Sequence, residues 1–170
     1  MRRRAVGLLA VAGWLLVSGI ASAGVKSKRA PGVDLSHVAT YRWKAESGPV
    51  APDLDRLIRA SAEQQLAKQG LKKASADGAA DLVLSYNAGL NDQLVLGTDI
   101  IAGWFGDLIV VGGDDSNVSA GMLFTFEDAT SGELVWGGWI RMRGTNENAP
   151  QVMRKKAPKA AAKILAAFPD

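Results

Sequence analysis

Two segments carry the three- and four-residue spacing of apolar positions that is typical of an amphipathic helix. In the segment 53–69 the apolar positions predict one buried helical face: Leu54, Leu57, Ile58, Ala62 and Leu66. Asp53 is expected to cap this helix and Gly70 to end it. Leu66 and Leu71 would then form the apolar pair that accompanies a Schellman motif.

The second helical segment begins at Ala149 and runs to the Phe168-Pro169 end. Its expected buried arc is Met153, Ala157, Ala161, Ile164, Leu165 and Phe168, and its opposite arc is Lys155, Lys156, Lys159 and Lys163. Pro158 lies inside the pattern, so this helix either kinks there or starts near that residue. The lysine arc fits an anionic lipid surface, but it is also the solvated face of an ordinary helix.

Strand patterns occupy four other segments, which are 39–44, 80–88, 119–128 and 133–143. Thr130-Ser131-Gly132 is turn chemistry, so the last two segments are predicted to form an antiparallel hairpin. Alternation along its second arm places four apolar side chains on one face: Leu134, Trp136, Ile140 and Met142. Gly137 and Gly138 mark a bulge or a close approach of the backbone to another element.

The stretch 89–117 is apolar but rich in glycine, and it contains Asp99 and Asp107. An aspartate in the middle of a membrane span costs about 2.5–3.5 kcal/mol on insertion scales, which argues against a span. We therefore expect an extra hairpin or a flexible apolar flap over the sheet. Exposed apolar surface of this kind is typical of a binding segment.

These elements predict an α+β fold. It consists of a mostly antiparallel sheet of four or more strands with two helices packed on one face, in the order β-α-β-(hairpin or flap)-β-β-α. The segment 33–170 is expected to be a single domain, and the polar, basic residues 24–32 are expected to be a flexible lead-in. About 147 residues can bury roughly 68–70% of the surface of their unfolded chain, which is enough for one stable core.

Residues 1–23 have the pattern of a secretory signal peptide. Three arginines precede the apolar stretch Ala5–Ile20, and Ala21-Ser22-Ala23 is a small-residue cleavage site. The apolar stretch is short for a stable membrane anchor, so cleavage and a periplasmic location are expected, and the product is not an integral membrane protein.

Charge is segregated along the chain of 170 residues. The net charge of +3 is carried by the leader arginines, and the rest of the chain is formally neutral. Residues 24–73, 74–140 and 141–170 carry +5, −10 and +5. A basic isoelectric point is therefore no argument for nucleic-acid binding, and no nucleic-acid partner is expected.

Few residues in the sequence fit known catalytic or cofactor chemistry. There is no cysteine, no phosphate-binding glycine motif and no nucleophile elbow. The single histidine, His37, adjoins Ser36, but adjacent side chains in an extended segment point apart, so the two form no nucleophile–base pair. We expect no catalytic residues, no cofactor and no metal site.

Two pairs in the stretch 89–117 are candidate partner contacts. Trp104-Phe105 is an aromatic pair in the predicted flap, where it could contact a ligand or a partner. Asp114-Asp115 is an acidic pair that could bind Ca²⁺, but the EF-hand pattern is absent and a solvated turn explains the pair better. We take Trp104, Phe105, Asp114 and Asp115 as the candidate partner-contact residues.

The order of elements resembles a bacterial envelope family called domain of unknown function 4136. The resemblance covers about residues 33–169 and is carried by VDLSHVATYRWK, DLDRLIRASAEQQLAKQGL, ADLVLSYNAG, GMLFTFEDATSGELVWGGW and KILAAFPD. Its most specific parts are Asp34 with Thr40-Tyr41-Arg42-Trp43, the Leu134-Val135-Trp136-x-Gly138-Trp139 strand and the Phe168-Pro169 end. The family resembles periplasmic or outer-membrane lipoproteins of Gram-negative bacteria without an established activity. This chain departs from the lipoprotein members because it has no cysteine to lipidate.

The sequence therefore predicts a non-enzymatic periplasmic or envelope accessory domain. It would bind a protein, a lipid or another envelope component through its sheet edge or through the 89–117 flap. The alternatives are a carrier of small apolar ligands and a metal-dependent hydrolase that uses His37, Asp114 and Asp115.

Overall fold

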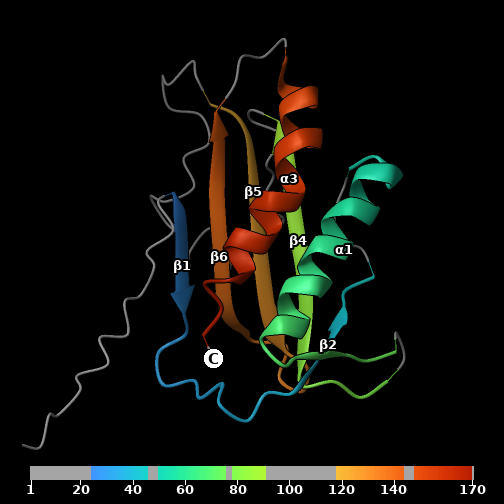
Figure 1. Ribbon diagram of the computed structural model, residues 1–170. Helices are drawn as coiled ribbons and strands as arrows, with labels where there is room; N and C mark the ends of the chain where they lie inside the picture. Colours follow the sequence, from blue (N-terminus) through green and yellow to red (C-terminus); the bar gives the residue numbers. More distant parts are fainter. Residues whose placement is uncertain (1–23, 46–49, 76–77, 91–117, 144–147, 170) are drawn as a thin grey trace, which may run out of the picture.

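The protein is an α+β fold in which two helices cover one face of a six-stranded sheet (Figure 1). The computed structural model describes residues 24–45, 50–75, 78–90, 118–143 and 148–169. Within these ranges the elements are β1 (Val25–Arg29), β2 (Thr40–Trp43), α1 (Pro52–Lys68), β3 (Lys72–Lys73), β4 (Leu82–Leu90), β5 (Val118–Asp128), β6 (Leu134–Arg143) and α3 (Ala149–Leu165). The predicted class and the placement of both helices on one face are confirmed.

The sheet is mixed, which corrects the expectation of a mostly antiparallel one. Its order is β1-β6-β5-β4-β2-β3. The pairs β1–β6, β6–β5 and β5–β4 are antiparallel, whereas β2 pairs in parallel with both β3 and β4. The reason is the crossover through α1, because a helix that carries the chain back across the sheet returns the next strand in the same direction.

Residues 25–29, expected to belong to a flexible lead-in, form the edge strand β1 instead. β1 pairs antiparallel with β6, with Val25 opposite Ile140 and Arg29 opposite Trp136. Its side chains are exposed, except for the half-buried Val25. An edge strand of this kind is held through its backbone, so its side chains show no apolar alternation.

The C-terminal end of α1 is the predicted Schellman stop. Gly70 has a φ of 85°, its N–H donates to the carbonyl of Ala67, and the N–H of Leu71 donates to the carbonyl of Leu66 at 3.0 Å. Leu66 and Leu71 are both buried. Glycine fits here because a side chain is strained at this positive φ.

The N-terminal end of α1 differs from the expectation. The cap is Ala51, with Pro52 in the first helical turn and no side-chain cap. Asp53 instead forms an ion pair with Arg154 of α3 at 2.7 Å, which explains its place in the first turn without a capping role. Leu57, expected on the buried face, is 49% exposed, whereas the other four predicted positions are buried, so the buried face of α1 is narrower than the apolar pattern predicts.

α1 and α3 lie side by side and run in the same direction (Figure 1). Near their middle the Ser61 hydroxyl donates to the carbonyl of Pro158 at 2.6 Å, and near their ends Gln69 Nε2 donates to the carbonyl of Leu165 at 3.1 Å. Pro158 lies within the helix, so α3 does not begin there. The predicted apolar arc of α3 is buried and its four predicted lysines are exposed.

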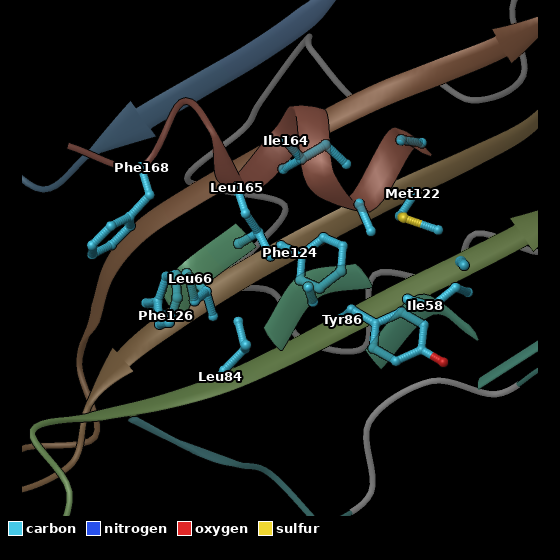
Figure 2. Close-up of a cluster of buried hydrophobic side chains, with 14 of the residues drawn as sticks. Ile58, Leu66, Leu84, Tyr86, Met122, Phe124, Phe126, Ile164, Leu165 and Phe168 are labelled. Carbon is cyan, nitrogen blue, oxygen red and sulfur yellow. The ribbon is translucent and has the colours of Figure 1, made fainter. Parts of the chain in front are cut away.

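The core lies between the helices and the sheet (Figure 2). The sheet contributes Leu84, Tyr86, Met122, Phe124, Phe126 and Trp136, and the helical layer contributes Ile58, Leu66, Ile164, Leu165 and Phe168. At one end of this core Phe168 packs against Phe126, with ring centroids 4.5 Å apart, and edge-on against Trp136 at 5.3 Å. These aromatic contacts attach the chain after α3 to the sheet.

The predicted turn between β5 and β6 is confirmed. Gly132 has a φ of 73°, and its N–H donates to the carbonyl of Asp128 at 2.9 Å. The Asp128 carboxylate accepts the N–H groups of Thr130 and Ser131, at 3.0 and 2.7 Å. These bonds, from Ser131 first and then Thr130, lower the pKa of Asp128 below its ordinary value.

The bulges of this hairpin lie elsewhere than at Gly137 and Gly138. The register shifts between Phe126 and Glu127 and between Val118 and Ala120. The first shift brings Val135, not Leu134, into the buried core beside Trp136. Gly138 instead fits the alternative prediction, because its backbone closely approaches the side chains of Trp136 and Ile164.

The Asp81 carboxylate joins the start of β2 to the start of β4. Its Oδ2 accepts the N–H of Ala39 at 2.9 Å and both the N–H and the hydroxyl of Thr40 at 2.8 Å. The Thr40 hydroxyl oxygen accepts the N–H of Asp81 in return. The bond from Ala39, and then those from Thr40, lower the pKa of Asp81 below its usual value.

We expect Asp81→Asn to lower the free energy of unfolding at pH 7, because the variant weakens the hydrogen bonds that the carboxylate accepts. The loss should be only about 1 kcal/mol, because the carboxylate is solvent-exposed. A lowered carboxyl pKa stabilises the fold above the unfolded-state pKa, near 3.8, and this contribution disappears as the pH falls through the folded-state value. The difference between the wild type and the variant should therefore shrink as the pH falls below about 4. Urea unfolding at several pH values measures it. Glu133→Gln is the charge-matched control, and an unchanged difference for Asp81→Asn across this range would contradict the assignment.

Candidate functional site

The four candidate partner-contact residues, Trp104, Phe105, Asp114 and Asp115, lie outside the described residues. His37 is described and lies exposed in a turn before β2. The Ser36 N–H donates to the Asp34 carboxylate at 2.9 Å, and this bond lowers the pKa of Asp34. In the described part of the chain no three His, Cys, Asp or Glu residues are grouped as metal ligands.

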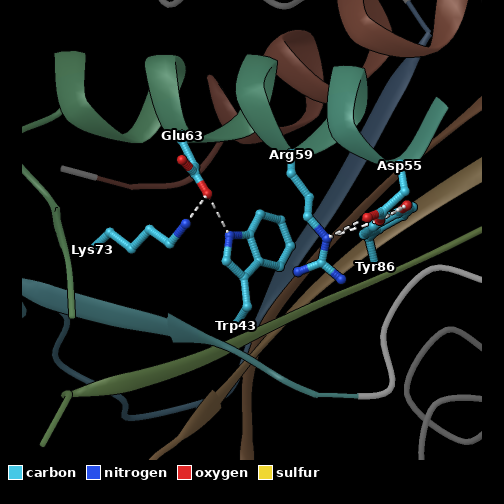
Figure 3. A network of polar contacts seen from close by, with 6 residues as sticks. All are labelled: Trp43, Asp55, Arg59, Glu63, Lys73 and Tyr86. Carbon is cyan, nitrogen blue, oxygen red and sulfur yellow. Dashed lines mark hydrogen bonds and ion pairs between the residues drawn. The ribbon is translucent and has the colours of Figure 1, made fainter. Parts of the chain in front are cut away.

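A polar network connects α1 to β2 and β4 (Figure 3). Asp55 Oδ1 accepts the Tyr86 hydroxyl at 2.6 Å and Arg59 Nε at 2.8 Å. The Arg59 guanidinium lies over the Trp43 ring, 4.4 Å from its centroid, and Trp43 meets Tyr86 edge-on. Burial first, and then the Asp55 hydrogen bond, raise the pKa of Tyr86 far above its ordinary value, so this hydroxyl stays protonated and donates.

One turn further along α1, Glu63 completes the network. Its Oε1 accepts Trp43 Nε1 at 2.9 Å and also the Lys73 ammonium of β3. Sequence reasoning missed this network, although Asp55, Arg59 and Glu63 recur every four residues and so lie along one stripe of the helix. The described polar groups bind one another, so the network orients α1 on the sheet.

Opposite the helices, the sheet has a second, smaller set of buried side chains. Leu123 and Trp139 are paired across β5 and β6, and they point away from the helix-side core because their neighbour Phe124 points into it. Leu123, Thr125 and Trp139 are each at most 3% exposed. The Thr125 hydroxyl is bonded to the Ser85 hydroxyl at 2.6 Å.

Two cations lie near the ring of Trp139 on this helix-free face. Lys26 Nζ of β1 is 5.8 Å from the centroid of its ring, and the Arg141 guanidinium is 5.2 Å away. Both distances fit cation–π contacts. The indole Nε1 is buried without a hydrogen-bond acceptor among the described residues. A buried donor without an acceptor is costly for the folded state.

β1 is one edge of the described sheet (Figure 1), and its Lys26 is paired with Trp139 of β6. The N–H of Ala30 donates to the carbonyl of Val135 at 2.9 Å, so residues 26 and 28 direct their N–H and C=O groups toward β6 in the same way. The N–H and C=O groups of Val25, Ser27 and Arg29 then point away from the sheet. Outward-facing groups of this kind, which bond to no other strand among the described residues, are able to pair with an added strand.

Both edges of the sheet are basic. β1 carries Lys26, Lys28 and Arg29, and β3 consists of Lys72 and Lys73. Asp53, Asp55, Glu63 and Glu127 form ion pairs, and Asp34, Asp81 and Asp128 accept backbone N–H groups. Lysine and arginine side chains thus lie along both edges of the described sheet.

Neither helix among the described residues has the length and apolarity needed to cross a membrane.

Several solved structures are similar to this chain. A domain of unknown function 4136 family protein from Bacteroides thetaiotaomicron matches with a TM-score of 0.54 and 11% identity, covering 82% of this chain and 93% of that one. A PelC dodecamer from Paraburkholderia phytofirmans matches with a TM-score of 0.48 and 16% identity, covering 84% of this chain and 94% of that one. A PDZ domain protein from Parabacteroides distasonis matches with a TM-score of 0.47 and 14% identity, covering 82% of this chain and 35% of that one.

At these identities the Bacteroides structure shows a shared fold and nothing about activity. No curated protein matches the chain at a significant level. The family model described as "Domain of unknown function (DUF4136)" matches residues 25–170, a range that includes β1 and every later element. The predicted resemblance is thereby confirmed, and the chain belongs to the DUF4136 family.

Proposed function

We propose that this protein is a non-enzymatic accessory domain of the bacterial cell envelope, exported to the periplasm, that binds an envelope component through the basic edge of its sheet. The pattern of residues 1–23 supports export. The membership in the family supports the envelope as the compartment, as the resemblance implies. The single observation that carries the binding role is β1, an edge strand with outward backbone groups and three cationic side chains.

The geometry favours binding at β1 over binding at the polar network of α1. Asp55, Glu63 and Tyr86 are engaged with partners inside the fold, so that network already has a structural role. The side chains of Lys26, Ser27, Lys28 and Arg29 are exposed. A partner reaches them without any rearrangement of the core, and their charge increases the rate of encounter with an anionic partner.

Photo-crosslinking in the host periplasm tests this function. A photoreactive amino acid at Ser27, on β1, is expected to yield a discrete adduct with an envelope component. The same amino acid at Gln64, which is exposed on α1, is the matched control and is expected to yield none. Identical adducts at both positions, or no adduct at Ser27, would contradict binding at the edge. Fractionation of the same cells checks that the chain is exported.

A further inference from the structure

We propose that β1 accepts an extended acidic segment of a partner protein as an added strand. This inference rests on the proposed function, because it names the chemistry of the component that binds at the basic edge. Binding of this kind is β-augmentation: main-chain hydrogen bonds hold the added segment, and the side chains at alternate positions determine which segment binds.

The backbone of β1 presents its outward N–H and C=O groups in the arrangement that an added strand needs. Because the Ala30 N–H donates to the Val135 carbonyl, the outward groups belong to Val25, Ser27 and Arg29. They occupy every second position along the strand, which is the spacing that an incoming extended segment needs. No described strand lies beyond β1.

The side chains of β1 define what the incoming strand should carry. Lys26 and Lys28 lie on the helix-free face, opposite Trp139 and Gly137 of β6. Lys26 Nζ lies 5.8 Å from the centroid of the Trp139 ring, a cation–π contact that favours placement of the ammonium at this edge. Opposite charges in cross-strand pairs stabilise a sheet, so acidic residues at alternate positions of the added strand would face these lysines.

The same charges disfavour a second copy of this chain as the occupant. Pairing β1 with β1 of another copy would place lysines against lysines, and pairing β1 with β3 would place them against Lys72 and Lys73. Like charges directly opposite each other destabilise a pair of strands. Lysines at an edge therefore prevent self-pairing and indiscriminate pairing while they select an acidic strand.

The test uses a fluorescent peptide of alternating Glu and Val, flanked by Thr, and the chain purified after export. We expect binding in fluorescence anisotropy that weakens with added salt. A control peptide of identical composition, with its Glu residues in one block, should bind at least tenfold more weakly. Ser27→Pro should weaken binding of the alternating peptide by at least tenfold, whereas Ser27→Ala should leave it within twofold of the wild type.

Ser27→Pro removes only the Ser27 N–H, which points away from β6. The variant therefore keeps every hydrogen bond of the described sheet and tests the outward-facing donor alone. Its unfolding midpoint should stay near that of the wild type, which separates lost binding from lost folding. Lys26→Glu supplies a second variant that keeps the backbone intact. It should weaken binding of the Glu peptide, because it places a like charge opposite the incoming strand at that position.

Three results would overturn strand addition. The first is equal binding of the two Glu peptides, and the second is unchanged binding by a folded Ser27→Pro, because each would show attraction by charge alone. The third is a dimer, detected by sedimentation, that Ser27→Pro dissociates, because it would make a second copy the occupant. A Ser27 crosslink that persists beside any of these results would leave the proposed function standing, and loss of the crosslink would remove both.

Discussion

Gly138→Ala is expected to lower the free energy of unfolding by about 2–3 kcal/mol, a large effect for the addition of one methyl group. A Cβ at this position would lie 2.5 Å from Trp136 Cη2 and 2.8 Å from Ile164 Cγ2. Trp136 is 1% exposed and Ile164 is fully buried, so neither side chain can move aside into solvent. The absence of a side chain at Gly138 lets α3 lie close to β6. Urea unfolding of the purified variant measures the loss.

Gly70→Ala is the matched control for this prediction. Gly70 has a φ of 85° but nothing within 4 Å of its added Cβ, so alanine there has only the backbone strain of a left-handed residue, about 1 kcal/mol. A loss at Gly138 no larger than the loss at Gly70 would mean that α3 can shift away from β6. Contact between the helix and the sheet would then be looser than the described packing.

Phe126→Ala is expected to have the largest effect of all, with a loss of about 3–5 kcal/mol. Phe126 is fully buried and contacts both Trp136 and Phe168, with ring centroids 5.8 and 4.5 Å apart. Its truncation removes ring contacts of β5 with both β6 and the chain after α3. The resulting cavity lies between rigid aromatic rings that cannot collapse into it easily. Chemical denaturation monitored by tryptophan fluorescence measures the loss.

Leu57→Ala is the control for core truncation. Leu57 is also a large apolar residue that the helical pattern assigns to the core, yet it is 49% exposed on α1. Its truncation should lower the free energy of unfolding by less than about 0.5 kcal/mol. Similar losses for Phe126→Ala and Leu57→Ala would show that burial does not distinguish the two sites.

These core predictions also bear on the proposed binding edge. β1 belongs to the fold through its backbone pairing with β6 and through the half-buried Val25, which packs against the core. The core near Trp136 and Gly138 holds β6 in place, and β6 in turn holds β1. A partner strand would therefore add to a preformed edge, which reduces the entropy lost on binding.

Much of the fold was readable from local patterns. The buried faces of α1 and α3, the Gly70 stop and the hairpin turn at Gly132 were all predicted from spacing and turn chemistry. These features depend on residues that are close together in the sequence, so a short segment is enough to predict each of them. Leu57 shows the limit of such predictions. The helical spacing of apolar residues indicates which residues can be buried, but it does not indicate how wide the buried face is.

The candidate site was less predictable. The lysines of β1 were visible in the sequence, but an edge strand is held by backbone groups that every residue shares, so VKSKR carried no strand pattern. The polar network of Asp55, Arg59 and Glu63 depends on Trp43 and Tyr86, which are distant in the chain. The four candidate contacts between residues 104 and 115 lie outside the described residues and stay predictions.

By itself, then, the sequence determined the α+β class, the two amphipathic helices, the hairpin and the family, because these follow from local periodicity and from motifs. Only the tertiary structure decided that the sheet is mixed, that residues 25–29 form its edge beside Trp139, and which backbone groups of β1 face outward. The reason is that pairing between β1 and β6 joins segments more than a hundred residues apart. The register of such a pair is set by the assembled core and not by the residues of either strand alone.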